Sequence, residues 1–192
     1  MANQHKRTIE FAGDYNLDNV FLHNHMGEIT DIKRVMVELN IYESIYSNGL
    51  TGSIVVGDAQ NLIGKLQING TERISFKLST PGTENQRDMV DASVETGHPF
   101  HIYKITDRRQ LNSNTLLYTL HFASREFMRN LRTKVSQTYR GNIAYQVMKI
   151  LMDKEYLDSK KEISYEPTGN INDVVIPNMR PFDAINMIAK KT

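Results

Sequence analysis

Histidine pairs are the first residues in this sequence with the chemistry of a site. His23 and His25 flank Asn24, so two imidazoles lie two positions apart. Two imidazoles do not close a metal site, because zinc takes at least three protein ligands. Nearby carboxylates offer a third ligand: Asp14, Asp18 or Glu28. Two solvated loop histidines account for the same pattern, and we expect no metal here.

The other histidines give little support for catalysis. His98 and His101 flank Pro99–Phe100 and permit an acid–base pair in principle. His121 lies on the polar side of an alternating run, facing outward or into a lumen. The chain has no cysteine, no G-x-S-x-G turn and no G-x-x-x-x-G-K-[ST] or G-x-G-x-x-G phosphate loop. We therefore expect a protein that is not an enzyme and that holds no cofactor.

A basic cluster is the most pronounced charge feature. Arg125, Arg129 and Arg132 are spaced at i, i+4 and i+7, which places them on one face of a helix. Such a face meets phosphates or an acidic patch on another subunit, or it is simply solvated. No aromatic residues are interleaved as stacking platforms, so single-stranded nucleic acid is disfavoured. We expect a partner-facing helix.

Tyrosines mark a second candidate surface. Tyr42 and Tyr46 alternate with Ser44 at the end of a long predicted strand, and so share one face. Half-polar rings of this kind suit subunit interfaces, and they suit ordinary sheet surfaces equally well.

The elements that position these residues change in character near residue 123. Up to that point, runs with period two alternate with Asn/Gly turns. They predict a long strand over 31–46, strands over 51–56, 72–79, 99–110 and 115–122, and a short helix over 59–66 that Asp58 begins. These strands favour an antiparallel β-barrel or a curled sheet.

The region from 124 onward is richer in helices. Ser124 is a plausible N-cap for a helix with Phe127, Leu131 and Val135 at helical spacing. Further helices are expected over 142–153 and 182–190, the last with Pro181 in its first turn. Short strands are expected over 163–165 and 174–176. The sequence thus predicts an α+β protein with a β domain over 1–123 and a small α/β region over 124–192. The second region is small for a self-sufficient domain, so we expect a chain cut from something longer.

Composition is that of an ordinary globular protein. Apolar residues make up 40%, charged residues 23%, and the formal net charge is +1. No apolar run approaches the ~18 residues of a membrane helix, and residues 1–8 lack the apolar core of a signal peptide. We expect a soluble protein that is made in a cytoplasm and has no membrane partner.

Two strings of residues carry a family resemblance. Residues 48–58 (Asn-Gly-Leu-Thr-Gly-Ser-Ile-Val-Val-Gly-Asp) are followed by Asn61-Leu62 and by 68–81 (Ile-Asn-Gly-Thr-Glu-Arg-Ile-Ser-Phe-Lys-Leu-Ser-Thr-Pro). This order resembles the opening domain of the tail baseplate hub proteins of T4-like contractile phages, with Gly70, Glu72 and Pro81 where the pattern expects them. Residues 122–126, 135–141 and 176–189 (Ile-Pro-Asn-Met-Arg-Pro-Phe-Asp-Ala-Ile-Asn-Met-Ile-Ala) are similar to that family's helical insertion. The resemblance covers about 30–192.

The resemblance implies a fold, a role and partners. The first domain would have the tail-tube fold, and the rest would begin an α/β insertion. Family hubs are about twice as long and form homotrimers with two tube-like domains per subunit. Such a ring joins the tail tube to the central spike, contacts baseplate wedge proteins and lets DNA pass without gripping it. It belongs to the virion's tail baseplate and is assembled in the host cytoplasm.

Other interpretations stay open. Within the same class, the chain fits a hub or spike component of another contractile injection system. From other classes, it fits a small-ligand-binding β-barrel or a hydrolase with His101 and His121 converging on an apolar cavity, or a nucleic-acid-binding barrel. Binding to a small ligand, or DNA affinity that falls steeply with salt, would favour these alternatives.

Overall fold

The chain folds into two compact units. The computed structural model describes residues 8–82, 89–169 and 171–190; the remaining positions of the two predicted domains, 1–7, 83–88, 170 and 191–192, lie outside the described residues. Unit 1 comprises residues 1–42 and 51–123. Unit 2 comprises residues 124–192 together with 43–50, a segment that the sequence placed in the first domain.

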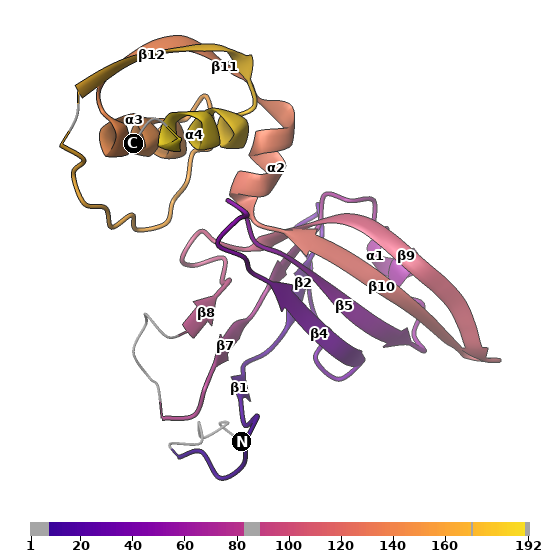
Figure 1. Cartoon of the computed structure of the whole chain (residues 1–192). Helices are drawn as coiled ribbons and strands as arrows, with labels where there is room; N and C mark the ends of the chain where they lie inside the picture. Colours follow the sequence, from indigo (N-terminus) through magenta and orange to yellow (C-terminus); the bar gives the residue numbers. More distant parts are fainter. Residues whose placement is uncertain (1–7, 83–88, 170, 191–192) are drawn as a thin grey trace. The chain divides into compact units, whose positions relative to one another are not determined.

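Unit 1 is built around a seven-stranded antiparallel sheet with the order β3-β2-β6-β9-β10-β5-β4. Its longest strands form two hairpins, β4–β5 and β9–β10, and the β9–β10 hairpin curves along its length (Figure 1). The strands are β2 (Phe21–His23), β3 (Ile29–Asp31), β4 (Met36–Tyr42), β5 (Thr51–Asp58), β6 (Arg73–Ser75), β9 (Phe100–Asn112) and β10 (Thr115–Ala123).

One face of this sheet carries the core of unit 1. Three aromatic rings pack together there: Phe100 lies 4.8 Å from Phe122 and 5.7 Å from Phe76 between ring centroids. Alternate residues of β5 and β10, including Ile54 and Leu120, complete the buried face. This is the period-two pattern of the sequence realised as one buried and one outward face.

The predicted strand over 72–79 is two strands. β6 ends at Ser75 and joins the large sheet, whereas β7 (Lys77–Ser79) joins a three-stranded sheet with β1 (Asn16–Leu17) and β8 (Met89–Asp91). Phe76 lies between them, buried in the aromatic cluster. The alternation of apolar and polar residues over 72–79 gave no sign of the break, because the chain passes from one sheet to the other while its side chains keep pointing alternately inward and outward.

The short helix α1 (Leu62–Leu66) begins three residues later than predicted and has Asn61, not Asp58, at its N-cap position. Asp58 still contacts the start of the helix. Its carboxylate accepts hydrogen bonds from the amides of Leu62 at 2.6 Å and Gln60 at 2.9 Å. Tyr118 also reaches this carboxylate with its hydroxyl at 3.4 Å. The carboxylate thereby ties the end of β5 to the start of α1 and to β10.

The predicted strand over 31–46 is too long at both ends. β4 starts at Met36 and ends at Tyr42, and a turn follows in which the Ser47 amide donates to the Ser44 carbonyl at 3.0 Å. The Ser44 hydroxyl accepts from the Tyr46 amide at 3.2 Å, a local bond typical of serine in turns. Tyr42 and Tyr46 therefore do not share a strand face.

Unit 2 has a two-stranded antiparallel ribbon and three helices. In Figure 1 the ribbon β11–β12 arches over α3 and α4. The Asn142 side chain caps α3 by accepting from the Tyr145 amide at 2.7 Å, and Pro181 is the first residue of α4. The elements are α2 (Arg125–Arg132), β11 (Val135–Asn142), α3 (Ile143–Met152), β12 (Ile171–Met179) and α4 (Pro181–Ala189).

The core of unit 2 corrects two sequence predictions. Val135 begins β11 rather than extending α2, and Leu131 is exposed, so α2 lacks the predicted apolar stripe. Residues 163–165 form no strand, and the pairing partner of β11 is the longer β12. The buried residues are Val135, Tyr139, Ile143, Ile150, Tyr156, Leu157, Val174, Ile176, Phe182, Ala184, Ile185 and Ile188.

The fold class is α+β with mostly antiparallel strands, as predicted. The barrel form of the prediction is wrong for the described residues, because β3 and β4 at the two ends of the large sheet do not pair with one another. The sheet is open.

Candidate assembly surfaces

One row of paired residues crosses the whole large sheet, and all of its members except the buried Ala123 are partly or well exposed. Partners opposite one another in an antiparallel pair point to the same face. The row starts at Ile29 on β3, the first residue of that strand, and finishes at Tyr42 on β4, the last residue of that one. Its members are Ile29, His23, Arg73, His101, Ala123, Thr51 and Tyr42.

Both edges of this sheet are open in the part of the chain that the structure describes. There β3 pairs only with β2, and β4 pairs only with β5. A register shift leaves Val37 as an extra, exposed residue near the start of β4, so the regular edge runs from Glu38 to Tyr42. Unpaired backbone groups along an edge are sites at which another chain can add.

A pocket of about 770 Å³ lies beside the β3 edge. Four of its lining residues are apolar, and two of these, Ile29 and Val94, are 60% and 45% exposed. The pocket is lined by Asp18, Asn19, Phe21, His23, Ile29, Ser75, Phe76, Lys77, Ser93, Val94 and Glu95. Its volume falls within the range of about 300–1,000 Å³ that is usual for binding pockets.

A histidine–serine pair supplies the hydrogen-bonding centre of this pocket. His23 Nε2 lies 2.6 Å from Ser75 Oγ. Burial, and to a lesser extent the nearby charge of Arg73, lowers the pKa of His23 below its usual 6.5. This shift favours the neutral imidazole, in which one nitrogen accepts a hydrogen bond and the other donates one. This arrangement suits binding of a hydroxyl or amide group.

The segment 43–50 of unit 2 presents an unusual pair of apolar side chains. Ile45 is 91% exposed and Tyr46 is 90% exposed. The base of the segment is fixed within unit 2: Asn48 donates to the Asn186 side chain at 3.0 Å, and a Cβ on Gly49 would lie 3.1 Å from Phe127 and 3.2 Å from Phe182. Two large apolar residues thus stand at the tip of an anchored segment.

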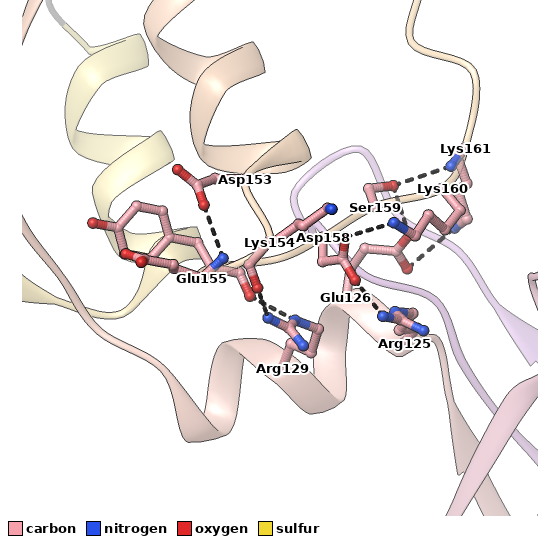
Figure 2. A network of polar contacts seen from close by, with 11 residues as sticks. Arg125, Glu126, Arg129, Asp153, Lys154, Glu155, Asp158, Ser159, Lys160 and Lys161 are labelled. Atoms are coloured by element: carbon pink, nitrogen blue, oxygen red, sulfur yellow. Dashed lines mark hydrogen bonds and ion pairs between the residues drawn. The ribbon is translucent and has the colours of Figure 1, made fainter.

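The predicted basic helix face is divided in its contacts. Arg125 forms an ion pair with Asp158, and Arg129 donates to the carbonyls of Tyr156, at 2.7 Å, and Lys154 (Figure 2). Arg132 lies exposed at the end of α2. Two of the three arginines therefore hold the segment after α3. Docking of this face to another protein stays a prediction, and Arg132 is the arginine best placed for it because it is exposed.

Polar residues fill the buried side of α2. Glu126 accepts from the Ser159 hydroxyl at 2.8 Å and lies 3.6 Å from the Lys161 ammonium. Asn130 accepts from the Phe182 amide at 2.8 Å, which satisfies a donor in the first turn of α4. The helix is therefore held to both the 153–161 segment and α4 by hydrogen bonds.

The described histidines lie apart from one another in different polar contacts. Among the described residues, no group of three or more His, Cys, Asp or Glu side chains is placed to hold a metal ion. Asn24 donates to Glu28 at 2.8 Å, and His121 Nε2 lies 2.8 Å from Thr106 Oγ1. His101 and His121 do not line the pocket, which contains His23 instead. No helix in the described part of the chain is long and apolar enough to span a membrane.

Three features were not apparent in the sequence. The exposure of Ile45 was not predicted, because the alternating pattern placed this residue within the strand over 31–46. The pocket combines segments around residues 18–29, 75–77 and 93–95, whose proximity depends on strand order. Glu126 and Asn130 gave no signal, because polar residues on a helix are expected to face solvent.

Comparison with known proteins returned no match, either to a protein-family model or to a curated protein.

Proposed function

We propose that this chain is a structural component of a phage tail baseplate hub, part of the ring that joins the tail tube to the central spike. The observation that carries the proposal is the open seven-stranded sheet whose outward row runs from one free edge to the other. A curved sheet with two open edges buries them by meeting further copies, and a repeated rotation closes a ring.

Other properties agree with an assembly role. The sheet's outward face is largely polar, with Arg73, His101 and Thr51 in its central row, as expected for a surface that meets water or a lumen. A hub or spike component of another contractile injection system would have the same architecture, so the proposal covers that class. The resemblance in the hairpin and in residues 176–189 favours the phage hub within it.

Solution mass and particle images test the proposal. We expect concentration-dependent self-association in analytical ultracentrifugation and rings with a central opening in electron micrographs. Tyr42→Lys should weaken association at least tenfold, since a charge on an edge strand opposes pairing. Leu111→Lys, on β9 of the same unit and similarly exposed, is the matched control and should associate like the wild type. A chain that stays monomeric and binds neither tube nor spike protein would refute the hub assignment.

The pocket supports one alternative, a small-ligand-binding protein. Its volume and its mixture of apolar walls with a hydrogen-bonding His23–Ser75 pair are those of a small-molecule site. Thermal-shift screening of small amphipathic compounds, repeated on His23→Ala, distinguishes this function. Stabilisation of the wild type alone would favour it, and no stabilisation by any compound would remove it.

A further inference from the structure

Cations gather along the middle strands of the large sheet in unit 1, on the face opposite its aromatic core. Arg73 on β6 pairs with His101 on β9, and further along β9 Lys104 pairs with His121 on β10. Arg109 lies further still along β9, in the same outward register. Arg73, Lys104 and Arg109 are all exposed, so their charges face the solvent on one side of the sheet.

The acidic residues of this face lie at its borders. Among the paired residues that the structure describes there, Asp31 is on the edge strand β3 and Glu38 is on the edge strand β4. Asp107 of β9 lies at a register shift and accepts a hydrogen bond from the Thr106 hydroxyl at 2.7 Å. The central strands β6 and β9 therefore carry a cationic track with carboxylates on the two outer strands.

An aromatic ring stands within this track. Tyr103 precedes Lys104 on β9, at another register shift, and is 41% exposed. Its ring centroid lies 6.2 Å from that of His121, which places the phenol on the same outward face. Exposed rings among cations are typical of sheet surfaces that bind single-stranded nucleic acid, because the cations contact phosphates while the rings stack on bases.

The length of the track suits several nucleotides. Leu117 and Ala123 of β10 lie opposite Arg109 and His101, and a strand rise of ~3.3 Å per residue separates them by about 20 Å. A stacked single strand places roughly six phosphates over that length. Such a number is within the usual site size of one nucleic-acid-binding sheet. A duplex hides the base faces on which a ring could stack, so the ring favours a single strand.

We propose that the outward face of the large sheet binds single-stranded nucleic acid along β6 and β9. Arg73, Lys104 and Arg109 contact phosphates, and Tyr103 stacks on a base. Contacts to phosphates and ring faces depend little on base identity, so the binding is sequence-tolerant. The inference goes beyond the hub assignment and does not depend on it, because that assignment concerns the edges of the sheet and this one concerns its face.

Fluorescence anisotropy of a labelled oligothymidylate mixed with the full chain tests the proposal. We expect a Kd on the order of 10 µM at physiological salt. The slope of log K against log salt should be about −2, because three phosphate contacts on a single strand contribute about −0.7 each. Lys104→Ala/Arg109→Ala should reduce that slope to about −0.7. Arg108→Ala is the matched control and should bind like the wild type, since the Arg108 charge lies near the hydroxyl of Tyr118, which is on the buried face.

The ring is tested by a second pair of variants. Tyr103→Leu should weaken binding by roughly 5- to 150-fold, the usual effect of losing one stacked base, without changing the salt slope. Tyr103→Phe keeps the ring and should bind within about twofold of the wild type. Circular dichroism of every variant checks that the fold is retained.

The contrary outcomes are equally definite. No binding at low salt would overturn the proposal. A duplex that binds as tightly as the single strand, or polyglutamate that displaces the oligothymidylate at equal charge, would identify a surface for polyanions in general and overturn the single-strand assignment. Equal losses in the Arg108→Ala and Lys104→Ala/Arg109→Ala variants would overturn the placement on this face. Self-association, measured separately by ultracentrifugation, reports on the hub assignment whichever result is obtained.

Discussion

Gly52 occupies a position in β5 where no side chain fits. A Cβ there would lie 2.3 Å from Phe122 Cζ and 2.4 Å from the Asn40 carbonyl oxygen. One of these obstacles is backbone, so it cannot rotate away. The glycine lets β5 lie between β4 and β10 with the Phe122 ring across it, in the aromatic cluster that forms the core of unit 1.

Gly52→Ala should therefore destabilise unit 1 by about 1–3 kcal/mol, the usual cost of overpacking a core. The measurement is the free energy of unfolding in urea. Gly57→Ala is the matched control in the same strand, because its Cβ would meet Val37 at an ordinary 3.6 Å. Equal stability of the two variants would contradict the steric argument.

Glu126 links stability to pH. Its pKa is below the usual 4.5: burial acts to raise it, but the Lys161 charge, a backbone hydrogen bond and the Ser159 hydroxyl outweigh burial. A carboxylate with a depressed folded pKa contributes stability that is present above its unfolded pKa and is lost as the pH falls through the folded pKa.

Unit 2 should accordingly lose stability as the pH is lowered from about 5 towards 3, and Glu126→Gln should reduce the slope in that window. Unfolding free energies at a series of pH values provide the measurement. The exposed Glu155→Gln is the control and should leave the slope unchanged. An identical pH dependence in wild type and Glu126→Gln would show that other groups are responsible.

At the scale of elements, polar side chains of α2 hold two other parts of unit 2 in place. Arg129 on one side holds the 153–161 segment through two carbonyls, and Asn130 on another meets the first turn of α4. Hydrogen bonds from a charged donor are stronger than those between neutral groups.

Arg129→Ala should cost about 1–3 kcal/mol of stability and make residues 153–161 more susceptible to limited proteolysis. Arg132→Ala, one turn further along the same helix and exposed, should change stability by less than about 0.5 kcal/mol. Mass spectrometry of the fragments locates the cuts. Equal cleavage of both variants would mean that Arg129 does not hold the segment.

The sequence located most elements and misjudged those whose limits depend on distant contacts. Helices α3 and α4 were predictable because each starts with a local signal: Asn142 is the N-cap of α3, and Pro181 is the first residue of α4. β12 was predicted too short, since its length follows from pairing with β11. Apolar and polar residues alternate continuously through Phe76, so the change of sheet there was not predicted. They also alternate through Tyr46, so the turn there was not predicted either. The site followed the same rule: His23 and the tyrosines were noticed, but their surroundings depend on strand order.

At the scale of the whole molecule, the chain passes between the two units at 42/43, 50/51 and 123/124. Each unit nevertheless has a core of its own, the aromatic cluster around Phe122 in unit 1 and the helix–ribbon core around Ile150 in unit 2. Separate cores permit separate cooperative transitions even within one chain.

Calorimetry with one variant in each unit tests this separation. Gly52→Ala should lower the melting temperature of one transition, and Asn130→Ala, which removes the acceptor for the Phe182 amide, should lower that of the other. A loss of about 1 kcal/mol lowers the midpoint by roughly 4–8 °C for a domain of 60–100 residues. Asn130→Asp keeps the acceptor and adds a charge that favours a helix N-terminus, so it should leave both midpoints near those of the wild type. A single transition whose midpoint both destabilising variants lower equally would show that the two cores unfold together. The three chain crossings would then couple the units so strongly that neither unit unfolds alone.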